Sequence, residues 1–149
     1  MANCVQETIV AWIKTKIDEL VTNEDLAAVT RPVRGGLAVR PQHLLGALYQ
    51  DDPQPDESTH GAAYWIMPCA LDLYVRPADD STDPVDTTIN NLRATAEKKL
   101  MEDATCGGNA HLLTIRAPQG FIEGEGFQGT RINFDVQFGT SESDPFTQV

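Results

Sequence analysis

The spacing of apolar residues along the chain predicts two amphipathic helices. In residues 3–22 the apolar side chains recur at steps of three and four, which places them on one stripe of a helix. This stripe consists of Val5, Ile9, Trp12, Ile13, Ile17, Leu20 and Val21. The stripe of the second helix consists of Val85, Ile89, Leu92, Ala96 and Leu100. Asp83 is expected to cap this helix and Pro84 to take its first position, with Lys98 and Lys99 near its C-terminus.

Strict alternation of apolar and polar residues predicts two strong strands. In residues 63–76 one face carries Trp65, Met67, Cys69, Leu71, Leu73 and Val75. The other face of this strand carries Asp72, Tyr74 and Arg76, and Pro68 is expected at a bulge or an edge. In residues 131–138 the inward side chains are Ile132, Phe134, Val136 and Phe138.

The remaining segments give weaker signals. Shorter strands are expected at 26–34, at 43–49, around 111–117 and near Phe121, although 37–50 also fits a helical turn. Segments 51–61 and 77–83 read as exposed loops, the first because it offers no apolar residue to bury, and 141–149 reads as a loose polar tail. The order of helix, strands, helix, strands predicts an α+β fold, a mostly antiparallel sheet with two helices packed on one face. We expect one domain over residues 1–140, followed by the tail 141–149.

Charge narrows the functional classes. The 149 residues include 22 acidic and 11 basic side chains, which gives a net charge of −11. A protein that coats nucleic acid needs clustered Lys and Arg to neutralise phosphates, so that class is excluded. The chain has no apolar run of about 18 residues that could span a membrane, and its first residues do not fit a secretory leader. Three cysteines far apart in sequence are expected to be free thiols in a reducing compartment, so synthesis is expected in the cytoplasm.

Motifs for cofactors, metals and nucleophiles are weak. Gly124–Gly129 matches G-x-G-x-x-G, but an alternating strand follows it instead of a helix, so the segment reads as a hairpin turn. The acidic run 79–83 lacks the glycine and glutamate of a calcium loop, and Cys106 with His111 has no second ligand pair for zinc. Cys69 is expected in the core, and Cys106 is expected to be exposed in a glycine turn. We therefore expect no cofactor, no metal and no catalytic residue.

The second half of the chain carries a recognisable pattern. A helix ends in Glu102-Asp103-Ala104-Thr105-Cys106-Gly107-Gly108, and a glycine-bearing turn later leads into Ile132-Asn-Phe134-Asp-Val136-Gln-Phe138-Gly-Thr140. This resembles the tail terminator (tail completion) proteins of long-tailed bacteriophages, in which a helix ends in an Asp-x-Thr-Leu-Gly-Gly-like turn. Cys106 stands here in place of the usual Leu. The N-terminal helix and the strand at Thr30-Arg31 fit the same layout.

The resemblance implies a structural virion protein of the phage neck, not an enzyme. Such proteins form a hexameric ring on the head-proximal end of the tail tube and stop its polymerisation. The implied partners are other copies of the chain, the tube protein, the neck or head-completion protein and, in contractile tails, the sheath. Genomic DNA passes through the lumen without specific binding.

Two groups of charged residues are candidates for contacts in such a ring. The acidic loops are expected to face the lumen or a partner through Asp51, Asp52, Asp56, Glu57, Asp79 and Asp80. The near-neutral N-terminal part is expected to meet an acidic patch of the next subunit through Lys14, Lys16, Arg31 and Arg34. The alternatives are another neck or tail component (a connector, stopper or tube-like protein), or a small α+β enzyme or ligand-binding domain.

Overall fold

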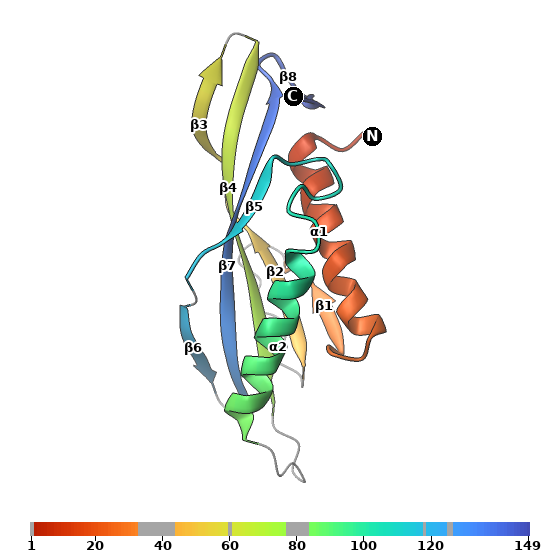
Figure 1. Cartoon of the computed structure of the whole chain (residues 1–149), viewed down its shortest axis with the longest axis vertical. Helices are drawn as coiled ribbons and strands as arrows, with labels where there is room; N and C mark the ends of the chain where they lie inside the picture. Colours follow the sequence, from red (N-terminus) through yellow and green to blue (C-terminus); the bar gives the residue numbers. More distant parts are fainter. Residues whose placement is uncertain (1, 33–43, 60, 77–83, 118, 125–126) are drawn as a thin grey trace.

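The fold is given by a computed structural model that describes residues 2–32, 44–59, 61–76, 84–117, 119–124 and 127–149. Figure 1 shows the course of the chain. In chain order the elements are α1 (Val5–Thr22), β1 (Ala28–Thr30), β2 (Leu45–Gln50), β3 (Gln54–Thr59), β4 (Ala62–Val75), α2 (Val85–Leu100), β5 (Leu112–Ile115), β6 (Gln119–Gly124), β7 (Phe127–Ser141) and β8 (Asp144–Gln148).

The two predicted helices are confirmed, with their apolar stripes in the core. The buried residues of α1 are Val5, Ile9, Val10, Ile13, Ile17 and Leu20. Those of α2 are Ile89, Leu92, Ala96 and Leu100. The start of α2 differs from the expectation by one residue, because Pro84 takes the N-cap position with an extended backbone and Val85 is the first helical residue. The proposed cap, Asp83, lies outside the described residues.

The sheet is built on the pairing of β4 with β7. These strands run antiparallel in continuous register from Ala62↔Ser141 to Val75↔Gln128. On the far side of β4 lie β2 and β3, and on the far side of β7 lie β5, β6 and β8. All of these pairings are antiparallel, and among the described strands the one parallel pairing joins β1 to β2. The predicted α+β class with a mostly antiparallel sheet is confirmed.

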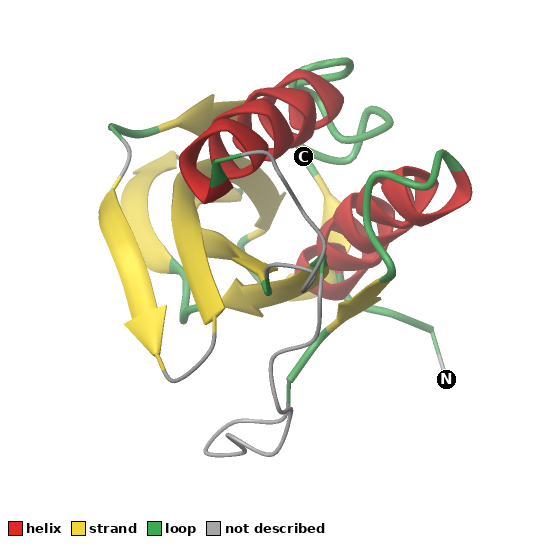
Figure 2. Ribbon diagram, turned by 90° about the horizontal axis from the view of Figure 1, so that it is seen from below, coloured by secondary structure: helices red, strands yellow, loops and turns green. Residues whose placement is uncertain are grey.

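Both helices cover the same face of the curved sheet (Figure 2). This inner face carries alternate residues of β4 and β7, among them Leu71, Leu73, Ile132 and Phe134, each at most 1% exposed. The opposite, outer face carries the intervening residues, and among them Asp72 is also buried. Neither described helix combines the length and the apolar composition that crossing a membrane requires.

Two segments expected to lack regular structure are edge strands instead. Residues 54–59 form β3 against β4, and 144–148 form β8 against β7. The expectations of an exposed loop at 51–61 and of a loose tail at 141–149 are therefore wrong for these residues. Both strands pair through backbone ladders, and neither carries an apolar alternation, so apolar periodicity could not reveal them. On β3, Pro55 and Asp56 are residue types that discourage further strand pairing.

Pro68 lies in the central strand β4, neither at an edge nor at a bulge toward β7. Pro68 pairs with Asp135 on β7, and the register does not shift between this pair and its neighbours on either side. The Pro68 carbonyl accepts a hydrogen bond from the Asp51 N–H at 2.8 Å, on the side of β2 and β3. There β2 has ended at Gln50 and β3 begins only at Gln54. The proline nitrogen faces this same side, just past the end of β2, so the missing N–H costs the β4–β7 ladder no hydrogen bond.

Truncation of the central strand is expected to be far more damaging than truncation at the edge. Phe134 on β7 is 0% exposed, whereas Leu112 on β5 is 44% exposed. Phe134→Ala should lower the free energy of unfolding by about 3–5 kcal/mol, because it leaves a cavity under both helices. Leu112→Ala should change it by less than about 1 kcal/mol. Urea unfolding of both variants measures the difference, and similar losses would contradict the assigned core.

Candidate functional site

The acidic residues proposed from the sequence lie partly on the connection from β2 to β3. Asp51 and Asp52 are exposed in this connection, and Asp56 is exposed on β3. The Asp52 N–H donates to the Asp51 carboxylate at 2.8 Å. Glu57 belongs to β3, but its side chain lies outside the described part of the structure. Asp79 and Asp80 lie outside the described residues. Whether any of these residues faces a lumen stays a prediction.

The basic residues proposed for a subunit contact are paired within the chain. Lys14 contacts Asp18 at 2.6 Å. Arg31 contacts Glu7 with both terminal nitrogens, at 2.7 and 3.2 Å, and this pair raises the pKa of Arg31 and lowers that of Glu7. Arg34 lies outside the described residues. A subunit contact through Lys14 or Arg31 would compete with these internal partners.

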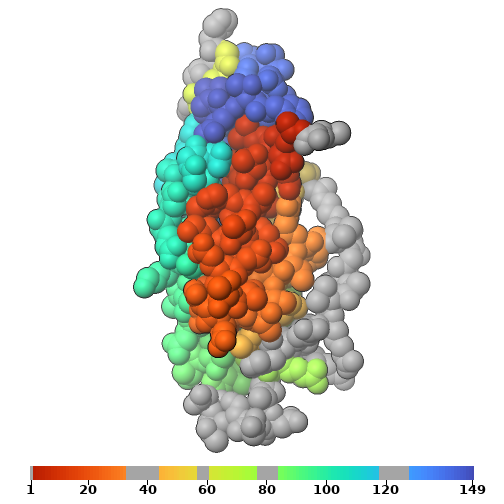
Figure 3. All heavy atoms as spheres, turned by 90° about the vertical axis from the view of Figure 1, so that its right-hand side faces the viewer, coloured from red at the N-terminus to blue at the C-terminus, as the bar shows by residue number. Residues whose placement is uncertain are grey.

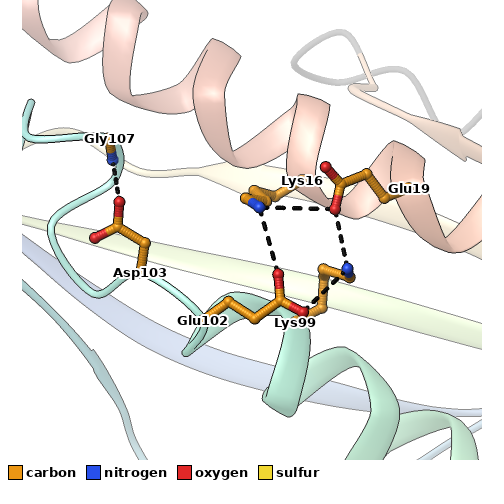
Figure 4. A network of polar contacts seen from close by, with 6 residues as sticks. All are labelled: Lys16, Glu19, Lys99, Glu102, Asp103 and Gly107. Atoms are coloured by element: carbon orange, nitrogen blue, oxygen red, sulfur yellow. Dashed lines mark hydrogen bonds and ion pairs between the residues drawn. The ribbon is translucent and has the colours of Figure 1, made fainter.

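Lys16 belongs to a network of ion pairs between the two helices (Figure 4). Lys16 lies 3.3 Å from Glu102 and 3.7 Å from Glu19, and Lys99 lies 2.9 Å from Glu19 and 3.1 Å from Glu102. Hydrogen bonding to Lys99 lowers the pKa of both glutamates, and the glutamates raise the pKa of Lys99. The network joins α1 to the end of α2, although each exposed pair adds little stability alone.

The turn after α2 carries the residues on which the family resemblance rests. The Asp103 carboxylate accepts hydrogen bonds from the N–H and the hydroxyl of Thr105 at 3.0 and 2.5 Å. It also accepts one from the Gly107 N–H at 2.9 Å. The Thr105 hydroxyl oxygen accepts from the Gly108 N–H at 3.2 Å. Asp and Thr therefore close the turn by satisfying its backbone donors.

The next three positions of the turn are also explained by geometry. Cys106 is 0% exposed, so this position takes an apolar side chain into the core. Gly107 and Gly108 have φ of 70° and 83°, which favour glycine. A Cβ on Gly107 would lie 2.7 Å from Nε1 of Trp12. The turn thus packs against α1, and each residue of its sequence pattern has a structural role in shaping or packing the turn.

Two of the three thiols, those of Cys69 and Cys106, are buried in the core. Burial raises the pKa of both Cys69 and Cys106 to about 12. The expectation of a core Cys69 is confirmed, whereas the expectation of an exposed Cys106 is wrong, because its turn folds back under α1. The His111 ring contacts the Val149 carbonyl oxygen at 2.8 Å. Within the described ranges, His, Cys, Asp and Glu side chains form no group of three that could hold a metal.

An ion pair that sequence reasoning did not single out lies on the outer face. Arg131 on β7 donates from Nε and Nη2 to the Asp72 carboxylate on β4, at 2.6 and 2.8 Å. The Tyr74 hydroxyl donates to Asp72 at 3.2 Å, and the Arg131 guanidinium lies 5.9 Å from the Tyr49 ring centroid. Asp72 and Arg131 are register partners on adjacent strands, and the sequence by itself does not reveal that pairing.

Arg131 of this pair also lines a cleft of about 280 Å³ on the outer face. Its wall includes Tyr49, Asp51, Arg116, Arg131 and Asn133. Arg116 contacts Asp135 at 3.3 Å, so both arginines are balanced by carboxylates. Hydrogen bonding to Asp72 raises the pKa of Arg131, and burial raises that of Tyr74. These groups keep their charge states at neutral pH and suit a structural cluster rather than proton transfer.

A second, mostly apolar pocket of about 240 Å³ lies at one end of the inner face, and we call it the end pocket. It is lined by Cys4, Gln6, Pro53, Trp65, Phe138, Thr140 and Pro145. Trp65 and Phe138 are register partners on β4 and β7, and the Trp65 indole N–H donates to the Thr140 hydroxyl at 3.3 Å. These residues continue the apolar inner face beyond the first turn of α1.

Comparison with known proteins finds no relative of this chain. No protein-family model matches the chain, and no curated protein shows significant sequence similarity to it.

The two glycines of the turn are expected to differ in their tolerance of a side chain. Gly108→Ala strains a positive-φ backbone in open space and should lower the free energy of unfolding by about 1–2 kcal/mol. Gly107→Ala carries the same strain and also displaces Trp12, so its loss should exceed that of Gly108→Ala by about 1 kcal/mol or more. Denaturant unfolding followed by tryptophan fluorescence compares them. Equal losses would show that the contact with Trp12 does not restrict this position.

The Asp103 carboxylate is expected to make the turn sensitive to acid. Hydrogen bonds from Thr105 and Gly107 hold its pKa below the ordinary value of 3.8. Because the folded-state pKa is the lower one, the stabilisation is present above the unfolded pKa and is lost as pH falls through the folded pKa. Asp103→Asn should be less stable at neutral pH and should lose less stability on acidification. Thr105→Val keeps the titrating group and should be intermediate. Urea midpoints against pH test this, and identical acid limbs for all three proteins would refute it.

Proposed function

We propose that the chain is a structural protein of the phage neck, a tail terminator that forms a hexameric ring on the head-proximal end of the tail tube. In this role the ring stops tube polymerisation, joins the tube to the head-completion or connector proteins, and lets DNA pass through its lumen. The protein acts in the virion and by assembly, without catalysis or a cofactor.

The observation that carries the proposal is the turn at residues 103–108. Its Asp, Thr and paired glycines each have a role in shaping the chain between α2 and the sheet. The buried Cys106 fills the position at which the family pattern has Leu. The resemblance implies a small α+β fold. This chain has such a fold, with two helices on one face of a mostly antiparallel sheet.

The charge of the chain supports the same proposal. A net charge of −11 keeps a surface free of DNA adhesion, which suits a channel that DNA must traverse quickly. The exposed Asp51, Asp52 and Asp56 lie together around the start of β3 and offer one such acidic surface. A different neck or tail component is the alternative, and a tube-like protein would differ by stacking on itself.

Native mass measured across protein concentration, with negative-stain averaging of any oligomer, tests the proposal. A particle of six subunits with a central hole is expected. Long stacked tubes would favour the tube-like alternative. A single copy at every concentration would overturn a ring that forms by itself, and a compact dimer would move the assignment toward an enzyme or ligand-binding domain.

A further inference from the structure

The last strand, β8, borders the end pocket but buries almost nothing of its own. Asp144 is partly buried, and the other residues of the strand are exposed. Phe146 is 53% exposed, and Val149, just after the strand, is 45% exposed. Pro145 nevertheless forms part of the wall of the end pocket. Figure 3 shows this segment (blue) lying across the N-terminal end of α1 (red). We call residues 144–149 the strap.

The strap is attached to its neighbours by polar contacts. The Val149 N–H donates to the Gly139 carbonyl at 3.1 Å, and the Val149 carbonyl oxygen contacts the His111 ring at 2.8 Å. The Gln148 amide donates to the Gly108 carbonyl at 2.6 Å. Within the described residues, the ladder to β7 has two Cα pairs, with a register shift between them. Hydrogen bonds at the surface are replaced by bonds to water when they break, so each adds little stability.

The chain on either side of Ser143 is held by separate sets of bonds. Before it, the Glu142 N–H donates to the Gly61 carbonyl at 3.1 Å, and the Gly61 N–H donates to the Glu142 carboxylate at 3.2 Å. After it, the Asp144 carboxylate accepts bonds from the N–H of residue 146 at 3.0 Å and from the hydroxyl of residue 147 at 2.6 Å. The strap can therefore move as one unit without breaking either set.

The strap closes against β7 at Gly139. The φ of this residue lies outside the left-handed region, so its backbone does not require glycine. The space does, because a Cβ would lie 2.8 Å from the Val149 carbonyl oxygen and 3.2 Å from ring atoms of His111 and Tyr64. β7 is fixed along its length by pairing with β4, whereas the strap is held by polar contacts. A side chain at residue 139 would therefore displace the strap rather than the strand.

We propose that the strap is a movable cover of the end pocket, which opens as a unit while the β4–β7 core stays folded. Opening removes Pro145 from the pocket wall and gives water access to Trp65 and Phe138. A segment with few buried apolar contacts and exposed hydrogen bonds opens at a lower free energy than the whole domain. The cover thus controls access to apolar side chains at this end of the sheet, whether or not the chain forms a ring.

Hydrogen exchange in low urea tests whether the strap opens by itself. Relative to their unprotected rates, the Val149 amide should exchange at least about 100-fold faster than the amides of Leu71 and Phe134 on the central strands. Its rate should not change with urea, because little surface is exposed, whereas the core amides should exchange faster as urea approaches the unfolding midpoint. Equal protection with the same urea dependence at all three amides would overturn the proposal.

The variant Gly139→Ala tests whether strap and pocket are coupled. In a Trp12→Phe background Trp65 is the one remaining tryptophan. Displacement of the strap should raise the acrylamide quenching constant of Trp65 about twofold or more and should remove the protection of the Val149 amide. Lost protection at Val149 with unchanged quenching would overturn the role of the strap as a cover.

The matched control is Gly46→Ala on β2, on the other side of β4 from β7. A Cβ there lies 3.2 Å from Leu26 and 3.3 Å from Val29, so this variant is also crowded, but away from the strap. It should leave the quenching of Trp65 and the exchange of Val149 unchanged in the folded protein. Equal increases in both glycine variants would show general loosening and would overturn the proposal.

A crosslink that holds the strap closed gives a measurement that does not depend on the folding of Gly139→Ala. Pro145→Cys places a thiol in the pocket wall with native Cys4, and the other two cysteines are buried. A short bismaleimide that joins residues 4 and 145 within one chain should slow exchange of the Val149 amide at least about tenfold. The control is the same variant treated with a monofunctional maleimide. Equal exchange in both products, or failure to join the two thiols, would overturn the proposal.

Discussion

The pairing of β4 with β7 is the constraint on which the rest of the molecule depends. Every other strand except β1 joins one of these two, and both helices pack on the face that they share. Because side chains alternate between faces, a slip of β7 by one residue against β4 would move Phe134 to the outer face. It would also carry Arg131 into the core and away from Asp72. The outer-face ion pair, buried at its carboxylate end, therefore reinforces the same register that the apolar core selects.

The turn at 103–108 connects the two layers. It follows α2, places Cys106 in the core and brings Gly107 against Trp12 of α1. It also meets the sheet, because the Leu113 N–H of β5 donates to the Ala104 carbonyl at 2.7 Å. The helices are joined a second time by Lys16, Glu19, Lys99 and Glu102 at the surface.

The surface divides into parts with different physical character. The cleft on the outer face contains arginines already balanced by carboxylates, and the faces of the helices hold paired charges. The end pocket differs from both, because the residues that line it are uncharged.

The sequence by itself determined the elements that bury apolar side chains. The stripes of α1 and α2 and the alternation in β4 and β7 fixed both helices, the inward residues and the α+β class, since burial acts on each residue's own side chain. It also indicated the glycine turn and the β6–β7 hairpin, which pairs Gly124 with Phe127. Only the tertiary structure decided the edge strands β3 and β8, the place of Pro68 and the burial of Cys106. Each of these depends on a backbone partner or a covering helix far away in sequence, and such a neighbour leaves no periodic mark on the segment itself.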